Sequence, residues 1–238
     1  TIERAVHAAS LVKTTYTAEP FDADFEKLKT DNSKLKNMNN YKRGDADVYK
    51  NAEFFVEGEF TVPYETHNPM ELQATIAVWD GDDKLTVYDK SQGPKSTQSA
   101  LAGCFNLDQK NVRVITENVG GAFGSALRSW PNVPAACIAA KKLKRPVKLV
   151  LTREQMFTMV GYRPYAWQHI AIGAGKDGKL TGIMHHAISN TSKYEDFGEG
   201  IVNASQFMYA CPNVNTTYKL LPLNINTPTW MRGPGPAT

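Results

Sequence analysis

Two predicted β-hairpins limit what this chain can fold into. Segments 74–80 (ATIAVWD) and 84–89 (KLTVYD) are rich in β-branched and aromatic residues, and the turn between them contains GDD. Segments 169–175 (HIAIGAG) and 180–189 (LTGIMHHAIS) flank KDGK in the same way. Asp-Gly pairs between such runs are typical of tight antiparallel turns. We therefore expect antiparallel sheet in two places.

The rest of the chain adds strands and helices by the same kinds of pattern. Further strands are predicted at 13–20, 54–62, 112–116 and 146–152, and helices at 2–12, 96–105 and 133–144. These elements mix without the regular β–α–β alternation of a parallel sheet. The sequence therefore predicts an α+β fold, with mixed sheets and packed helices.

A polar stretch interrupts this pattern between residues 21 and 51. Its middle part, KLKTDNSKLKNMNNYKRGDAD, contains almost no core residues. We predict that 21–51 is a linker or a surface excursion whose lysines form a solvated face. The chain starts at Thr1 and stops at MRGPGPAT, and we expect it to be a piece of a longer protein.

Composition and charge exclude several classes of protein. Hydrophobic residues make up 42% of the chain and charged residues 21%, which indicates a globular protein with a core. The net charge is +3 and the lysines are scattered, so no stripe for nucleic acid stands out. No apolar run reaches the ~18 residues of a membrane-spanning helix. Cys104, Cys137 and Cys211 are far apart and are expected to be buried small hydrophobic residues.

A glycine-rich loop, ITENVGGAFGSALRSW at 115–130, directly follows a predicted strand. Glycines at such a place provide a positive φ or room for a close approach. The loop fails the dinucleotide fingerprint because Ala122 stands at the third position counted from Gly120. It fails the P-loop pattern because Ser125 follows five residues after Gly120, with no lysine behind it.

Two interpretations of the loop remain open. In one, a strand, a glycine turn and a helix N-terminus present bare backbone N–H groups that cradle an anion. In the other, the loop is only a tight turn with Phe123 in the core, and the sequence of the loop alone slightly favours this second interpretation.

Hydrolase and zinc chemistry are not indicated, because the chain has no G-x-S-x-G elbow and its five histidines lack metal-binding spacing.

Four motifs read together carry a family resemblance. They are VPYETHNPME (62–71), VYDKSQGPKSTQSALA (87–102), VGGAFGS (119–125) and WMRGPG (230–235), in this order. Together they resemble the molybdenum-binding subunit of the xanthine oxidase family, the molybdenum hydroxylases. The resemblance runs from about residue 44 to the end of the chain.

The resemblance implies a fold, a division of the chain and a cofactor. It implies the first molybdopterin-binding α+β domain at 52–238, incomplete at its C-terminus, with 21–51 as the linker and 1–20 as the tail of a preceding small α+β domain. The cofactor it implies is molybdopterin, as the cytosine dinucleotide, whose dithiolene sulfurs hold the molybdenum. The protein then orients a cofactor without supplying the metal ligands.

The resemblance also assigns roles to particular residues. The amide of Gln92 donates a hydrogen bond to an oxo ligand, Phe123 lies beside the molybdenum, and the backbone at Arg232 closes on the metal site. The implied cofactor-binding residues are Gln92, Gly120, Gly121, Ala122, Phe123, Gly124, Arg232 and Gly233. Gln92, Phe123 and Arg232 face the metal through the cofactor. The side chain of Gln92 and loop 120–124 are therefore expected to meet at one edge of the domain.

Each of these residues also has an ordinary structural interpretation. Taken alone, Gln92 is a solvated residue at a strand end and Arg232 is a surface charge. His67 is expected to be a hydrogen-bonded structural histidine, because nothing in the sequence places a partner for proton transfer beside it.

Departures from the family pattern bear on the substrate. Leu127 stands where purine oxidases carry a substrate-binding glutamate, and Pro234 replaces an aromatic that sandwiches a flat purine. Both residues are assigned to the substrate pocket, and both favour an aldehyde or another apolar substrate. Ala126 replaces a common basic residue, and Pro236 replaces a common glutamate.

The implied reaction hydroxylates the substrate with water and passes two electrons onward. The resemblance implies partner domains or subunits with 2Fe–2S clusters and FAD, and a general-base glutamate beyond Thr238, so no catalytic residue is expected in this chain. The chain alone is expected to be inactive, and we expect no nucleic-acid partner and no membrane span. The alternative is a non-catalytic binding or interaction domain that keeps the fold without the cofactor. A cytoplasmic location is expected, with the periplasm as the alternative.

Overall fold

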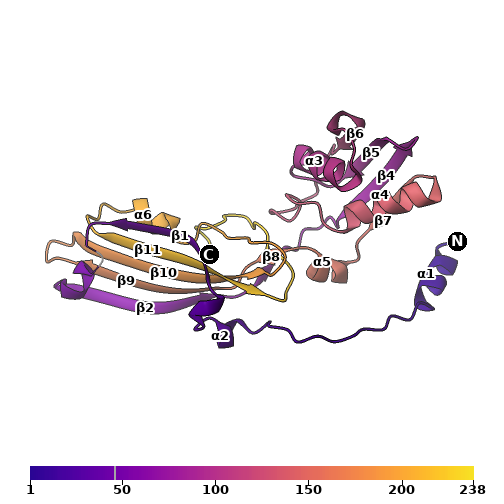
Figure 1. The fold of residues 1–238 in the computed structure, drawn as a ribbon. Helices are drawn as coiled ribbons and strands as arrows, with labels where there is room; N and C mark the ends of the chain where they lie inside the picture. Colours follow the sequence, from indigo (N-terminus) through magenta and orange to yellow (C-terminus); the bar gives the residue numbers. More distant parts are fainter. Residues whose placement is uncertain (46) are drawn as a thin grey trace.

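The protein is described by a computed structural model that covers residues 1–45 and 47–238. Two sheets dominate it, and they form two separate regions (Figure 1). The strands are β1 (Lys36–Arg43), β2 (Phe54–Val62), β3 (Glu65–Thr66), β4 (Ala74–Asp80), β5 (Lys84–Asp89), β6 (Val112–Ile115), β7 (Val147–Val150), β8 (Tyr162–Arg163), β9 (Ala166–Ala174), β10 (Leu180–Ser192) and β11 (Val214–Leu223). The α-helices are α1 (Ile2–Ser10), α2 (Phe25–Leu28), α3 (Pro94–Phe105), α4 (Asn132–Leu143), α5 (Arg153–Met159) and α6 (Asn203–Phe207). The α+β fold class is confirmed.

The larger sheet has the strand order β1-β11-β10-β9-β2. Strands β9 and β10 form the predicted hairpin around the KDGK turn, where Gly178 has φ +76°. Strand β10 pairs in parallel with β11, which it reaches through the long connection that contains α6. Alternate residues of β9 and β11 are buried, as in strands with one face on a core.

The smaller sheet has the order β6-β5-β4-β7, and α3 and α4 pack against it. Its core contains Ala77 and Val87 from the sheet, Leu101 from α3, and Ala136 and Cys137 from α4. Each helix ends at a residue in the left-handed region, Asn106 after α3 and Lys144 after α4. This conformation is a common way to terminate a helix. The small residues of the alanine-rich helix allow it to lie close to the strands.

Several predicted elements agree with the structure. Strands β2, β4 and β5 have the predicted bounds, and α3 and α4 differ from prediction by only one or two residues at each end. Cys137 and Cys211 are buried, but Cys104 is exposed, contrary to prediction. None of the helices in the described part of the chain is long and apolar enough to cross a membrane.

Local structure differs from the sequence-based expectations in several places. Residues 13–20, all of them described, form no strand, so that prediction was wrong. Within 21–51, the stretch expected to be a linker or a surface excursion, β1 pairs with β11 along the edge of the larger sheet and Tyr49 is buried. The segment after the glycine loop folds into turns, and the next helix begins at Asn132. The division into a preceding tail and a separate domain stays a prediction.

Candidate functional site

A cavity of about 540 Å³ lies where the glycine loop meets the last residues of the chain. Three segments that are far apart in the sequence surround it: the start of α3, the glycine loop, and residues 230–234. The lining residues are Gln92, Ser96, Phe123, Gly124, Leu127, Trp230, Met231, Arg232 and Pro234. Most of these side chains are apolar, with one amide and one guanidinium among them.

The glycine loop has an unusual backbone. Gly121 and Gly124 have φ values of +91° and +107°, and Phe123 between them has φ 56°. A non-glycine residue in the left-handed region is uncommon and strained. Phe123 is 48% exposed and lines the cavity. The interpretation that places Phe123 in the core is therefore wrong.

Gln92 is fixed against this loop by three hydrogen bonds. Its Oε1 accepts from the backbone N–H of Gly124 at 3.0 Å and of Ala126 at 3.3 Å. Its own backbone N–H donates to the Ala126 carbonyl at 2.8 Å. These contacts confirm that Gln92 and the loop meet. Two N–H donors on one side of the amide also set its orientation, because only the oxygen can accept from them.

The loop leaves backbone donors free. The N–H groups of Gly121, Ala122 and Phe123 donate to no residue within 1–45 and 47–238, and neither does the Nε2 of Gln92. Successive backbone N–H groups in a turn of this kind form a concave site for an anion or another electron-rich atom. Gly120 differs, because its N–H donates to the Glu71 carboxylate at 2.5 Å. The N-terminus of α3 also approaches the loop, since a Cβ on Gly93 would lie 3.7 Å from the Leu127 carbonyl oxygen.

The last residues of the chain form the opposite wall and contact the loop directly. The Arg232 N–H donates to the Phe123 carbonyl at 2.9 Å. A Cβ on Gly124 would lie 2.1 Å from the Trp230 carbonyl oxygen. This approach is possible only for glycine, so the close-approach role of the glycines applies at position 124.

His67 lies behind this wall and is 3% exposed. Its Nδ1 lies 3.1 Å from the Gly161 carbonyl oxygen, and its Nε2 lies 2.8 Å from that of Trp230. Burial lowers the pKa of His67, while the two carbonyl contacts oppose that shift. A neutral imidazole has one N–H and donates to only one of the two carbonyls. His67 is therefore the hydrogen-bonded structural histidine that the sequence led us to expect.

A buried ion pair anchors the same wall. Arg163 is 2% exposed, and its Nη1 lies 3.3 Å from Oε2 of Glu199, which is also buried. Arg163 donates through Nη2 to the Arg232 carbonyl and through Nη1 to the Thr238 hydroxyl, both at 2.8 Å. Its Nε lies 2.8 Å from the Glu65 carboxylate without the alignment of a hydrogen bond. Arg163 and Glu199 therefore fix residues 232–238 to the larger sheet region.

The residues singled out from the sequence fall into two groups. Gln92, Phe123, Gly124, Leu127, Arg232 and Pro234 line the cavity, whereas Gly120, Gly121, Ala122 and Gly233 do not. Ser96, Trp230 and Met231 also line the cavity, although the sequence did not predict this role for them. Ser96 lies four residues after Gln92 at the start of a predicted helix, and Trp230 and Met231 belong to the WMRGPG motif, so both signals were present. Ala126 is buried and does not line the cavity.

Known proteins share this sequence pattern and this fold. The chain is 34% identical over 195 residues to the aldehyde oxidoreductase molybdenum-binding subunit PaoC of Escherichia coli O157:H7, and the match covers 82% of the chain and 26% of PaoC. Aldehyde oxidase 4 of Arabidopsis thaliana is 33% identical over 171 residues, which cover 70% of the chain and 13% of that protein. The chain thus spans about a quarter or less of the length of these relatives.

Solved structures show the same fold at lower sequence identity. The aldehyde oxidoreductase from Desulfovibrio gigas superposes with a TM-score of 0.88 at 22% identity, over 99% of this chain and 27% of that one. Quinoline 2-oxidoreductase from Pseudomonas putida 86 superposes with a TM-score of 0.86 at 19% identity, over 99% of this chain and 32% of that one. A family model of the molybdopterin cofactor-binding domain matches residues 28–238. The chain, with its glycine loop clasped by residues 230–234, belongs to the molybdopterin cofactor-binding domain family, and with it to the molybdenum hydroxylases.

Proposed function

We propose that this chain provides cofactor-facing and substrate-facing loops of a molybdopterin-dependent hydroxylase that oxidises aldehydes. One observation carries the proposal. The Oε1 of Gln92 is held by two N–H groups of the glycine loop, so its Nε2 donor is free on a residue that lines the cavity. This fixed donor suits an electron-rich oxygen atom of a bound group.

The residues present fit an oxygen-rich cofactor such as molybdopterin. The free N–H groups of Gly121, Ala122 and Phe123 would hold its oxygen atoms or those of its phosphate, without any side chain being charged. Gly120 keeps its place through Glu71, and Gly124 and Arg232 close the loop against the opposite wall. When bound, the cofactor supplies a molybdenum centre that transfers oxygen from water to the substrate and accepts two electrons.

The wall of the cavity supports an apolar aldehyde as the substrate. Leu127, Met231 and Pro234 line it, and their side chains offer no hydrogen-bond donor and no acceptor stronger than the Met231 thioether. A site built to read a purine needs polar partners for the ring nitrogens, because a buried group without its partner is unfavourable. The names of PaoC and of aldehyde oxidase 4 agree with this substrate class.

The remaining parts of the reaction belong to segments or subunits other than this chain. We propose that a glutamate outside residues 1–238 acts as the general base, and that the two electrons leave through 2Fe–2S and FAD units. We also propose the cytosine dinucleotide form of the cofactor. The 238-residue chain alone is accordingly expected to show no hydroxylase activity.

The experiment compares two glycine variants of the enzyme that contains this chain. Gly121 and Gly178 both have a positive φ, +91° and +76°. A new Cβ at Gly178 meets nothing within 4 Å, and one at Gly121 makes ordinary contacts, 3.6 Å from Pro69 and 3.7 Å from the Phe123 ring. Gly121→Val and Gly178→Val should therefore each lose roughly 1–3 kcal/mol of stability through backbone strain. Only the valine at position 121 would project next to the free N–H groups of the loop.

Molybdenum content per protein and the melting temperature are measured for both variants. We expect Gly121→Val to fold but to lose molybdenum and aldehyde oxidation together, while Gly178→Val retains both. Full molybdenum occupancy in folded Gly121→Val would show that nothing approaches this loop. A wild-type protein that folds without molybdenum would support the non-catalytic alternative instead.

A further inference from the structure

We propose that Trp230 determines substrate choice as a rigid aromatic wall on which planar aromatic substrates stack. This inference rests on the proposed function and names a substrate class for the same cavity. Trp230 lines the cavity and is 38% exposed, although the rings around it are well packed. An exposed indole face beside an apolar cavity is a surface that a flat apolar ligand can cover.

Two neighbours pack against the indole. The Phe197 ring meets it edge to face, with ring centroids 5.3 Å apart and an interplanar angle of 83°. The guanidinium carbon of Arg128 lies 5.2 Å from the Trp230 ring centroid. Both arrangements are favourable geometries for an aromatic ring. Trp230 therefore loses little further freedom when a ligand binds to it.

Arg128 acts as the brace between the two rings. Its guanidinium carbon also lies 5.3 Å from the Phe197 centroid, and its Nη1 is paired with the Glu195 carboxylate at 2.5 Å. Its buried Nε has no hydrogen-bond acceptor in the described part of the chain. The ion pair fixes the guanidinium in one position, which keeps it against both rings.

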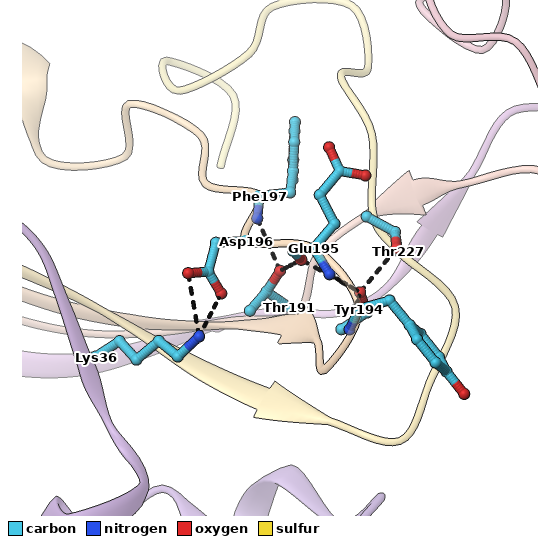
Figure 2. A network of polar contacts seen from close by, with 8 residues as sticks. Lys36, Thr191, Tyr194, Glu195, Asp196, Phe197 and Thr227 are labelled. Carbon is cyan, nitrogen blue, oxygen red and sulfur yellow. Dashed lines mark hydrogen bonds and ion pairs between the residues drawn. The ribbon is translucent and has the colours of Figure 1, made fainter. Parts of the chain in front are cut away.

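A hydrogen-bonded turn at 191–197 holds Glu195 and Phe197 in place (Figure 2). The Thr191 hydroxyl donates to the Glu195 carbonyl and accepts from the Phe197 N–H, both at 2.8 Å. The Ser192 hydroxyl accepts from the Glu195 N–H at 3.0 Å and contacts the Thr227 hydroxyl at 2.7 Å. Thr191 and Ser192 are fully buried. The turn thus supports Glu195, which pairs with Arg128, and Phe197, which packs against Trp230.

A charged contact ties this turn to the edge of the larger sheet. Figure 2 shows Lys36, on β1, reaching the carboxylate of Asp196 with its ammonium group at 2.8 Å.

The side chain of Tyr194 in the same turn is exposed, and the residue as a whole is 87% exposed. Tyr194 therefore serves as a matched control for the variants below, because it belongs to the turn but does not contact Trp230.

The test uses the molybdenum-loaded enzyme that contains this chain, with benzaldehyde and acetaldehyde as substrates. In Trp230→Leu, which keeps apolar bulk but removes the ring, we expect kcat/KM for benzaldehyde relative to acetaldehyde to fall about tenfold. In Trp230→Phe the ratio should fall less than about threefold, because a ring remains. An unchanged ratio in Trp230→Leu, or an equal loss for both aldehydes, would overturn the proposal.

Arg128→Met tests the brace, and Tyr194→Ala is the control. Arg128→Met leaves Trp230 in the sequence but removes its support, so KM for benzaldehyde should rise several-fold while kcat changes less. Tyr194→Ala should leave the ratio of the two aldehydes unchanged. A fall in kcat with constant KM in Arg128→Met would contradict a positioning role for Arg128.

A binding measurement separates this inference from the proposed function. If the wild-type enzyme holds molybdenum but oxidises neither aldehyde, the proposed function fails, and benzamide then serves as an unreactive planar probe. The chain has four tryptophans, and quenching of their fluorescence by benzamide should be weaker in Trp230→Phe than in the wild type. Equal quenching in the two proteins would overturn the proposal, whatever the reaction is.

Discussion

The glycine loop and residues 230–238 close the same cavity, but different forces hold them. The loop is held mainly by short-range backbone contacts, such as the Ser125 N–H to the Ala122 carbonyl at 3.1 Å. Its distant supports include the side chains of Gln92, Glu71 and Gln73, and each of them bonds to backbone groups of the loop. The opposite wall is fixed by buried side chains from remote strands and loops, among them Arg163, Glu199 and His67. One wall is therefore built from backbone geometry and the other from buried polar side chains.

This difference determines which wall tolerates substitution. A wall whose hydrogen bonds end on backbone groups depends on the few glycines that have a positive φ. A wall held by a buried ion pair fails when either partner is removed, because the remaining charge is left without compensation. The three variants below test this contrast, from the largest expected effect to the smallest.

Replacing Arg163 should have the largest effect on stability. Arg163→Met leaves the buried Glu199 carboxylate without its charged partner and frees the carbonyl of Arg232, which together should cost about 3–5 kcal/mol. Urea unfolding of the purified protein measures this loss. Lys36→Met is the control, because its ion pair with Asp196 is half exposed, and it should cost less than about 1 kcal/mol. Equal losses in the two variants would mean that the ion pair does not anchor the wall.

Substituting Gly124 should have an intermediate effect, since it forces the two walls apart. Gly124→Ala combines a positive φ with a Cβ 2.1 Å from the Trp230 carbonyl oxygen. Backbone strain alone costs roughly 1–3 kcal/mol, and the clash adds to it. Gly178→Ala carries the same type of strain with nothing within 4 Å of its Cβ. The difference in melting temperature between the two isolates the contact between the walls, and its absence would show that the walls move independently.

Removing the Gln92 amide should have the smallest effect. Gln92→Leu takes away one acceptor from the N–H groups of Gly124 and Ala126, and we expect a loss of about 1 kcal/mol. Hydrogen exchange at these two amides measures the change locally, and it should speed up there while the core of the smaller sheet keeps its protection. Slow exchange at Gly124 in this variant would mean that the loop does not need Gln92.

The sequence predicts the strands best where β-branched and aromatic residues are concentrated. The segments 54–62 and 74–80 are of this kind, and β2 and β4 have the predicted bounds although β2 is a largely exposed edge strand. Strand β1, with the sequence KNMNNYKR, escaped prediction because it consists mostly of lysine and asparagine. The false strand at 13–20 has β-forming residues, but no neighbouring strand pairs with it in the structure.

The sequence predicts the wall formed by the glycine loop better than the opposite wall. Motifs located Gln92, Phe123 and Arg232, which all line the cavity, because glycines and short motifs are local signals. Arg163 and Glu199 were missed, since they are 36 residues apart and nothing in either segment indicates that they meet. The WMRGPG motif contains Trp230 but does not indicate its role, because the contacts that support its ring form only in the folded chain.

The position of the N–H proton on the buried His67 ring decides which of two backbone carbonyls the ring holds. Both of its nitrogens face carbonyl oxygens, one belonging to Gly161 and the other to the Trp230 wall. Burial lowers the pKa of His67 and so favours the neutral ring, whose two tautomers differ in which carbonyl is bonded and which is left bare. Transfer of the proton from one nitrogen to the other therefore loosens one attachment as it tightens the other. The wall that carries Trp230 is thus coupled, through one imidazole, to the backbone that enters β8.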